Sequence, residues 1–287
     1  MPEMPEVEAL RRFLADKLVD KAIISTQLVA FSALKTVLPP LDALHGMPIS
    51  GVSRHGKFLD IDAQGVHMVF HLARAGWLVW RDEMPDKPLK LGKGPMALRV
   101  RLSDGSGFDL TEAGTQKHLA VHVVTDPDQI DMVATLGPDP TDELFTADDF
   151  DALLTRSGRA QVKGVLKDQR VLAGIGNAYS DEILHVAKLS PFLPVSSLSR
   201  PQRDDLLDTI RTVLAEAVDA TEGLGAESLK DSKRAGLRVH GRTGKPCPVC
   251  GTTIAEVSFA DSSLQYCPGC QTGGKPLADR RMSKLLK

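Results

Sequence analysis

The chain has 287 residues, of which 42% are hydrophobic, 25% charged and only 5% aromatic. This composition excludes a mainly disordered protein and predicts two or three globular domains with largely aliphatic cores. The formal charge of −2 excludes a global attraction to polyanions, so any such site must come from local clustering of basic residues. We find neither a secretory signal nor an apolar run of membrane-spanning length, and therefore expect a cytoplasmic protein with no membrane partner.

The first half of the chain predicts one helix followed by short strands. Apolar residues recur at three- and four-residue spacing over residues 5–18, which indicates an amphipathic helix. From about residue 23 to residue 124, short apolar runs alternate with turns, as where Leu98–Leu102 precedes Asp104-Gly105. Strands without intervening helices predict an antiparallel sandwich or barrel, which we assign to residues 2–125 together with the first helix.

The middle of the chain predicts an acidic linker and then a helical domain. Residues 126–151 hold nine Asp or Glu and no Lys or Arg, and we assign residues 126–145 as the linker. Thr146 with Asp149 is typical of a capping box at a helix start. Further helices are predicted at about 160–168, 178–188 and 201–221, within a domain over residues 146–240.

All four cysteines lie near the C-terminus in two pairs, Cys247-x2-Cys250 and Cys267-x2-Cys270, with sixteen residues between the pairs. Four thiolates at this spacing are typical of one structural Zn²⁺ in a closed tetrahedral site. The alternative is four free or redox-active thiols. The residues between the pairs predict a β-hairpin, so we assign a zinc ribbon to residues 241–272. Such ribbons are common in nucleic-acid-binding proteins, which is an analogy only.

The N-terminal Met-Pro sequence indicates that the initiator methionine is removed, leaving Pro2 as a free secondary amine. Such an amine titrates near neutrality and is a competent nucleophile at neutral pH. Attack on a sugar C1′ would give an iminium ion that promotes elimination of a phosphate. Glu3 and Glu6 offer an acid and a second carboxylate beside it. The alternative is an ordinary solvated helix start.

Several sequence blocks occur together in one order: Met1–Glu8 followed by Arg11-Arg12, Arg54–Leu59, Leu136–Pro140, Gly174–Tyr179, Gly241-Arg242 and the four cysteines. This ordered set spans nearly the whole chain and resembles the formamidopyrimidine-DNA glycosylase and endonuclease VIII family of base-excision repair enzymes. The resemblance implies an α+β multidomain protein. Its parts would be an N-terminal antiparallel β-sandwich with an N-terminal helix, a helix–two-turns–helix DNA-binding domain and a C-terminal zinc ribbon, with DNA in the cleft between the halves.

The resemblance also implies roles for individual residues. Pro2 would be the Schiff-base nucleophile, Glu3 the general acid that opens the sugar, Glu6 part of the lesion pocket, and Lys57 a contact to the phosphate at the lesion. Asn177, on a glycine loop at a helix start, would hold the DNA backbone. Further basic residues at backbone-contacting positions are Arg159, Lys163 and Arg242. A solvated basic face is the alternative for the cluster around Arg242.

The chain also departs from the family pattern. Typical members fill the space of the flipped base with a Met, an Arg and a Phe, whereas this sequence has Arg74 in place of the Met and neither of the other two residues. Arg74, Gln116 and Lys117 are our candidates for that task. Ser262 stands where the family has a ribbon arginine. A basic tail, residues 273–287, follows the ribbon and includes Arg280, Arg281 and Lys284.

These observations lead to one main hypothesis and two rivals. The main hypothesis is a monomeric, bifunctional DNA glycosylase and abasic-site lyase that acts on double-stranded DNA with a damaged base or abasic site. The first rival is a catalytically weak relative that binds damaged DNA as a recognition module. The second is a zinc-ribbon protein that acts on RNA or on another protein, which leaves the ordered N-terminal blocks unexplained.

Overall fold

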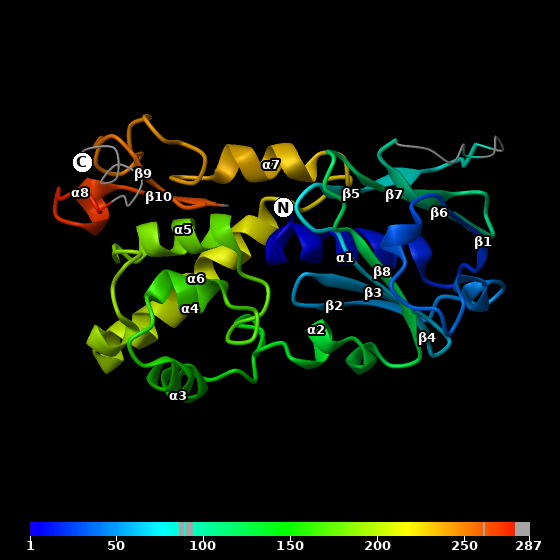
Figure 1. The fold of residues 1–287 in the computed structure, drawn as a ribbon, viewed down its shortest axis with the longest axis horizontal. Helices are drawn as coiled ribbons and strands as arrows, with labels where there is room; N and C mark the ends of the chain where they lie inside the picture. Colours follow the sequence, from blue (N-terminus) through cyan, green and yellow to red (C-terminus); the bar gives the residue numbers. More distant parts are fainter. Residues whose placement is uncertain (86–88, 90–93, 261, 279–287) are drawn as a thin grey trace. The chain divides into compact units, whose positions relative to one another are not determined.

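The computed structural model describes residues 1–85, 89, 94–260 and 262–278 (Figure 1). They form two compact units. Unit 1 comprises Met1–Leu136 with Thr221–Ser232, and unit 2 comprises Gly137–Ala220 with the described residues from Lys233 onward. Arg280, Arg281 and Lys284 of the basic tail lie outside the described residues. Within the described part of the chain, we find no helix with the length and apolar character needed to traverse a lipid bilayer.

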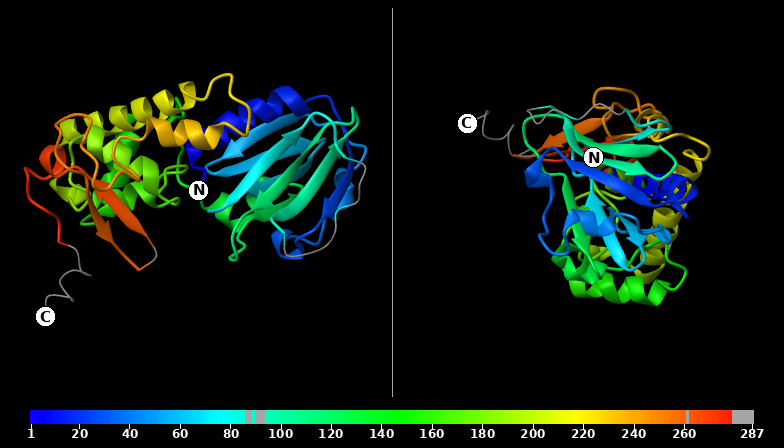
Figure 2. Two further views of the ribbon diagram at one scale, coloured as in Figure 1. Left: turned by 90° about the horizontal axis from the view of Figure 1, so that it is seen from above. Right: turned by 90° about the vertical axis from the view of Figure 1, so that its right-hand side faces the viewer.

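Unit 1 is a sandwich of two antiparallel four-stranded sheets, as the sequence predicts (Figure 2). One sheet has the order β1–β6–β7–β5 and the other the order β2–β3–β4–β8. The strands are β1 (Ile23–Leu28), β2 (Gly51–His55), β3 (Phe58–Ala63), β4 (Val66–His71), β5 (Gly76–Arg81), β6 (Met96–Leu102), β7 (Gly107–Glu112) and β8 (Ala120–Val124). Apolar side chains from both sheets, such as Phe70 and Phe108, form one buried core.

Helix α1 (Met4–Leu18) packs against strands β2 and β3 and completes this core. Leu10, Leu14 and Leu18 are fully buried along one face, which explains the apolar period in the sequence. The segment Thr221–Ser232 is tied to the same unit, because the Trp77 Nε1–H donates to the Ala226 carbonyl at 3.0 Å.

A charged cluster crosses the β5–β7–β6 side of the sandwich. Arg99 alternates with apolar residues in β6, yet its side chain is buried because it forms a bidentate pair with Asp109, at 2.7 and 3.0 Å. Arg81 contacts the same carboxylate at 2.8 Å. Burial raises the pKa of Asp109, but the hydrogen bonds from Arg99 and Arg81 outweigh it and hold the pKa below its usual value.

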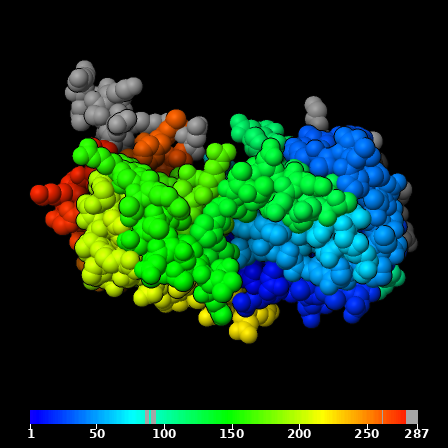
Figure 3. Space-filling model, turned by 90° about the horizontal axis from the view of Figure 1, so that it is seen from below, coloured from blue at the N-terminus to red at the C-terminus, as the bar shows by residue number. Residues whose placement is uncertain are grey.

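The acidic stretch, residues 126–151, belongs partly to unit 1 and partly to unit 2 and folds into turns and helices. In unit 1 it forms a 3₁₀ turn (Pro127–Gln129) and the short helix α2 (Asp131–Ala134), whose neighbour Ile130 packs near Phe58 and Val69. In unit 2, Phe145 meets Phe150 edge to face, with ring centroids 6.3 Å apart. The carboxylates stay on the surface, part of which Figure 3 shows in green.

Unit 2 joins a group of helices to a small β-hairpin. Its helices are α3 (Ala147–Ser157), α4 (Val162–Lys167), α5 (Asn177–Val186), α6 (Arg200–Asp219) and α8 (Pro268–Gln271), while α7 (Leu229–Gly236) begins in unit 1. Thr146 and Asp149 form the expected capping box of α3. Strands β9 (Ala255–Ser258) and β10 (Ser263–Tyr266) pair antiparallel, and this hairpin packs on α5 through β10.

The Asp109 cluster predicts a measurable asymmetry between its partners. Asp109→Ala leaves the buried Arg99 guanidinium without its carboxylate and should lower the free energy of unfolding by about 3–5 kcal/mol. Arg81→Ala removes only a partly exposed partner and should cost about 1 kcal/mol or less. Urea denaturation of both variants measures the difference. An equal loss for the two would show that the Arg99 pair contributes nothing beyond a surface ion pair.

Candidate functional site

The start of α1 is held by a reciprocal capping box between Glu3 and Glu6. The Glu3 backbone N–H donates to Glu6 Oε2 at 2.8 Å, and the Glu3 side chain accepts from the backbone of Glu6. Both carboxylates are at most 2% exposed, and Pro2 is buried beside them. The sequence indicated two acids near Pro2. The structure adds that these acids hold the backbone of the helix start directly after Pro2.

Arg54 joins the first turn of α1 to the turn that carries Lys57. Its Nε donates to Glu8 Oε2 at 3.3 Å, and its Nη1 donates to the Gly56 carbonyl at 2.9 Å. Burial raises the pKa of Glu8, but hydrogen bonds from Arg11 and Arg12 and the charge of Arg54 outweigh it, so the pKa is lowered and the carboxylate is ionised. Arg54 thus joins the helix start to the Lys57 turn, and we call these two contacts the Arg54 clamp.

Lys57 lies in the tight turn between β2 and β3 and is only 8% exposed. Gly56 has φ of +56°, a conformation that glycine adopts without strain. The family block predicted a functional lysine here, whereas the strand pattern alone would predict an exposed one. Burial of the side chain shows that this lysine is not an ordinary surface residue.

His71 is a neighbour of Lys57 that the sequence analysis did not select. It pairs with Phe58 across β3 and β4, and its ring lies 4.8 Å from the Phe58 ring. Burial, assisted by the positive charge of Lys57, lowers the pKa of His71 to about 4. The imidazole is therefore neutral at pH 7 and can donate one hydrogen bond. The sequence signal that could have identified His71 is its position at the end of β4, close to the turn that holds Arg74.

The three residues suggested as base-space fillers lie on two neighbouring loops of unit 1. Arg74 and Gln116 are exposed, and the loops are linked by the Ala113 N–H, which donates to the Ala75 carbonyl at 3.2 Å. Lys117 turns back, and its ammonium donates to the Glu112 carbonyl. The buried Glu112 carboxylate accepts the backbone N–H groups of the same loop at 2.9–3.0 Å. Of the three side chains, Arg74 and Gln116 are exposed to solvent.

In unit 2, the loop before Asn177 is fixed by residues of the Leu136–Pro140 block. The Gly137 N–H donates to the Gln169 carbonyl at 2.8 Å, and the Ala173 N–H donates to the Pro138 carbonyl at 3.0 Å. A Cβ at residue 137 would meet the Val171 carbonyl oxygen at 2.4 Å, so only glycine fits there. Two sequence blocks that lie far apart in the chain therefore build one rigid loop.

The Asn177 side chain spans from the start of α5 to the ribbon hairpin. Its Nδ2 donates to the Ser263 carbonyl at 2.7 Å. Its backbone carbonyl accepts from Lys163 Nζ at 3.2 Å. One amide hydrogen of Asn177 is thus used inside the protein, and this bond fixes the distance between the helix start and the tip of the ribbon.

The other basic candidates of unit 2 differ in how their charges are held. Lys163 is buried, and its ammonium donates to Asp181 at 2.6 Å and to Ser180 at 2.7 Å. Arg159 is exposed and makes no hydrogen bond or ion pair with any residue that the structure describes. Arg242 is half-buried, and its Nε is enclosed without a hydrogen-bond partner among the described residues. Arg159 therefore keeps its guanidinium donors available to a ligand, whereas Arg242 has one enclosed donor that no described residue satisfies.

The four cysteines converge as a zinc site requires. Cys250 Sγ lies 3.3 Å from Cys267 Sγ and 3.4 Å from Cys270 Sγ, and Cys247 Sγ lies 3.9 Å from Cys270 Sγ. None of the four forms a disulfide. Four soft thiolates from two knuckles fit one tetrahedral Zn²⁺, with no position left for water. The chain thus carries a structural zinc site, which confirms the prediction from spacing.

His185 is a second group that the sequence analysis missed. It comes from α5 and lies with Cys247, Cys267 and Cys270 in a cluster whose ligand atoms are all within 4.8 Å of one another. Its Nε2 is 3.2 Å from Cys247 Sγ, and the ring is 2% exposed. Burial lowers the pKa of His185, which keeps the imidazole neutral. An N–H donated to a thiolate disperses its charge and orients it toward the metal.

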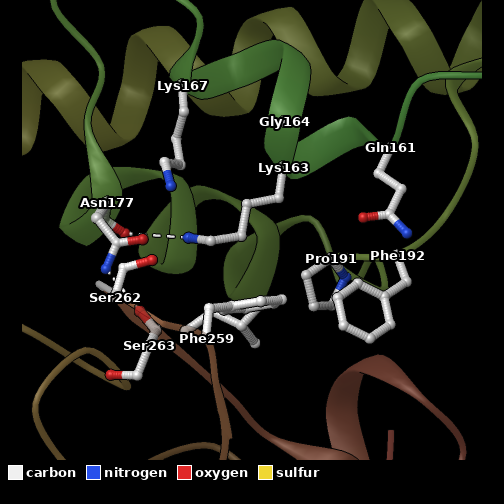
Figure 4. A pocket seen from close by; sticks show the side chains of 11 residues that line it. Gln161, Lys163, Gly164, Lys167, Asn177, Pro191, Phe192, Phe259, Ser262 and Ser263 are labelled. Atoms are coloured by element: carbon white, nitrogen blue, oxygen red, sulfur yellow. Dashed lines mark hydrogen bonds between the residues drawn. The ribbon is translucent and has the colours of Figure 1, made fainter. Parts of the chain in front are cut away.

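Unit 2 also contains a pocket between α4, the start of α5 and the ribbon hairpin (Figure 4). Its volume is about 340 Å³. Asn177, Ser262 and Lys167 lie toward one side of the view and the ring of Phe192 toward the other, with Lys163 and the ring of Phe259 between them. Ser262, which replaces the expected ribbon arginine, thus lines the same pocket as Asn177.

The Glu3–Glu6 capping box predicts different outcomes for two substitutions. Glu6→Ala removes the acceptor for the Glu3 N–H and should lower the free energy of unfolding by about 1 kcal/mol. Glu6→Gln keeps a carbonyl oxygen there and should retain most of that stability. Chemical denaturation measures both variants. If Gln were as destabilising as Ala, the carboxylate charge rather than the cap would hold the helix start.

The His185 contact predicts weaker metal binding when the imidazole is removed. His185→Leu should reduce zinc affinity by roughly tenfold to a hundredfold, the usual effect of losing an outer hydrogen bond. Competition with a chromogenic chelator measures the affinity. His122→Leu, which alters another partly buried histidine in unit 1, is the matched control and should leave zinc affinity unchanged. Equal zinc affinity in wild type and His185→Leu would contradict the assigned contact.

Three family models match successive parts of the chain. The formamidopyrimidine-DNA glycosylase N-terminal domain matches residues 1–126, and the formamidopyrimidine-DNA glycosylase H2TH domain matches residues 136–228. The zinc finger found in FPG and IleRS matches residues 244–273. The three matches follow the order of the sandwich, the helices and the ribbon.

Curated relatives and solved structures match over nearly the same length. A formamidopyrimidine-DNA glycosylase of Heliobacterium modesticaldum is 34% identical, covering 94% of this chain and 100% of that protein. An uncharacterised formamidopyrimidine-DNA glycosylase-like protein of Mycobacterium tuberculosis is 59% identical over 53% of this chain and 94% of its own length. The crystal structure of the Thermus thermophilus protein has a TM-score of 0.79 at 30% identity, covering 96% of this chain and 100% of that one.

The Lactococcus lactis glycosylase bound to DNA containing an abasic site has a TM-score of 0.80 at 28% identity, covering 94% of this chain and 99% of that one. Identity above 30% over most of the chain, with three ordered domain models, is specific evidence of common descent. The chain therefore belongs to the formamidopyrimidine-DNA glycosylase family.

Proposed function

We propose that the protein is a bifunctional DNA glycosylase of base-excision repair, which removes a damaged base and then cleaves the strand as an abasic-site lyase. Family membership supports the glycosylase activity, and solved relatives bound to abasic and lesion-containing DNA support damaged DNA as the substrate. Removal of Met1, which is 47% exposed, would leave the buried Pro2 as the terminal amine.

The chemistry follows from an amine at residue 2. The Pro2 nitrogen bonds to C1′ of the damaged nucleoside, the bond from C1′ to the base breaks, and the base leaves with the proton that the amine loses. Glu3 gives its proton to O4′ as the sugar ring opens, and an iminium ion forms. A water molecule takes a C2′ proton, and the electron pair of that C–H bond forms a double bond to C3′ as the 3′ phosphate leaves. Water hydrolyses the iminium and returns the free amine.

The remaining residues of unit 1 bind and orient rather than react. Lys57 and the neutral His71 supply one charged and one neutral donor suited to a phosphate oxygen. Glu6 holds the backbone of Glu3 and lines the start of α1. Arg74 and Gln116 are exposed donors that can occupy the space of a flipped base. The zinc ion supplies no reacting group and holds the ribbon in shape.

One observation carries the proposal: the family-matched residues at the N-terminus are buried and braced. Glu3 and Glu6 are acidic side chains with almost no exposed surface, and their capping box is tied through Glu8 and Arg54 to the Lys57 turn. Two buried acidic side chains are more than the start of a solvent-exposed helix requires. This arrangement is suited to holding an N-terminal amine in one position.

A second candidate function is damaged-DNA recognition without efficient turnover. Arg74 replaces the Met that fills the space of the flipped base in typical members, and Ser262 replaces the ribbon arginine that holds the flipped nucleotide there. In this case the protein would bind abasic duplex tightly and release no base.

Borohydride trapping separates the two candidates. The wild-type protein with Met1 removed, incubated with abasic duplex and borohydride, should form a covalent protein–DNA adduct, because reduction of the iminium makes the bond to Pro2 permanent. Gel shift under denaturing conditions and mass measurement of the N-terminal peptide detect the adduct. Binding of abasic duplex without any adduct would favour the recognition module.

In the matched control, the amine of Pro2 is first blocked by an N-terminal extension and then restored by cleavage. A variant with a protease-removable N-terminal extension has an amide at Pro2 and should form no adduct, and cleavage that exposes Pro2 should restore it. Adduct formation before cleavage would assign the nucleophile to a different residue.

A further inference from the structure

The pocket of unit 2 combines one available cation with an exposed aromatic ring. Lys163 also lines it, but that ammonium is already bound by Asp181 and Ser180. The Lys167 ammonium makes no hydrogen bond or ion pair with any residue that the structure describes, although the backbone carbonyl of Lys167 accepts from Gln169 Nε2 at 2.8 Å. None of the described lining residues is acidic. The charge offered to a ligand is therefore positive and comes from the end of α4.

Phe259 provides the apolar part of the pocket. It is 44% exposed at the turn of the β9–β10 hairpin and makes no ring contact with a described residue. Figure 4 shows its ring between Ser262 and the ring of Phe192. A large aromatic side chain left open in the same pocket as a lysine is a costly surface in water and a suitable platform for a flat, anionic ligand.

Hydrogen-bonding groups lie on the same side of the pocket as Lys167. Asn177 uses one amide hydrogen on Ser263, and the second can still be donated. The Ser262 hydroxyl is exposed at the same end of the pocket. A cation, an amide, a hydroxyl and an aromatic face match a nucleotide, with its phosphate on the polar side and its base on the ring.

We propose that this pocket holds one unpaired DNA nucleotide, with the base stacked on Phe259 and the flanking phosphate on Lys167. The inference rests on the proposed function, since it takes DNA as the ligand. A base inside a duplex is already stacked on both faces and cannot contact Phe259 without leaving the helix. The pocket therefore directs the protein toward DNA that is already open, such as a single strand, gap or bubble.

Two substitutions test the two halves of the pocket with a short single-stranded oligothymidylate as the probe. Phe259→Ala should weaken binding of the probe by roughly tenfold, as loss of one base-stacking contact does, and should weaken binding of a duplex of equal length less. Lys167→Gln should reduce the slope of log affinity against log salt concentration by about 0.7, the value for one phosphate on a single strand. Fluorescence anisotropy over a range of salt concentrations measures both.

The controls keep the result interpretable. Lys188→Gln removes an exposed lysine of unit 2 that does not line the pocket and should leave single-strand binding unchanged at a fixed salt concentration. Zinc content and denaturation midpoints establish that each variant is folded. Equal weakening of single-strand and duplex binding by Phe259→Ala, or an unchanged salt slope in Lys167→Gln, would overturn the proposal.

Borohydride trapping and the binding measurements together distinguish this inference from the proposed function. Absence of a borohydride adduct in the wild type would refute the lyase and leave the single-strand measurement in force. Conversely, adduct formation together with equal losses on the two probes would support the lyase and refute the pocket.

Discussion

The clamp made by Arg54 is the interaction on which the N-terminal site depends. One guanidinium bonds the Glu8 carboxylate on α1 and the Gly56 carbonyl in the following turn, so the helix start and Lys57 cannot move independently. Arginine suits this task because its planar fork presents several donors in fixed directions, which the lysine ammonium does not. The capping box of Glu3 and Glu6 then fixes the backbone beyond the clamp. These contacts together hold Pro2 and Lys57, which are far apart in the sequence, in one part of unit 1.

Unit 2 is organised around a buried acid in a comparable way. Asp181 accepts from Lys163 on one oxygen and from His240 Nδ1, at 2.7 Å, and the Gln265 N–H, at 3.2 Å, on the other. The neighbouring Glu182 accepts three successive backbone N–H groups from Arg238, Val239 and His240, at 2.7–2.9 Å. Helix α5 therefore holds the ribbon through two adjacent carboxylates. Burial of such groups is tolerated because every oxygen is satisfied.

The periodicity of the sequence predicted the sandwich, the main helices and the ribbon, because these elements follow from repeating apolar patterns and from the spacing of cysteines. It could not predict pairs that are close only after folding. Arg99 is in an alternating strand and is buried because Asp109, on the next strand, meets it across the sheet. His185 carries no local signal, and His71 carries only its position at a strand end: each becomes significant through a neighbour distant in sequence, Lys57 for His71 and Cys247 for His185.

The bond from Asn177 to the Ser263 carbonyl gives the metal site an influence beyond its own hairpin. Ser263 begins β10, the strand that runs directly into Cys267, so the zinc thiolates and the contacts of β10 with α5 together keep the acceptor of this bond in place. Removal of zinc would loosen one of the two attachments of this strand and so weaken the bond to the Asn177 amide, while the residues at the N-terminus stay unchanged.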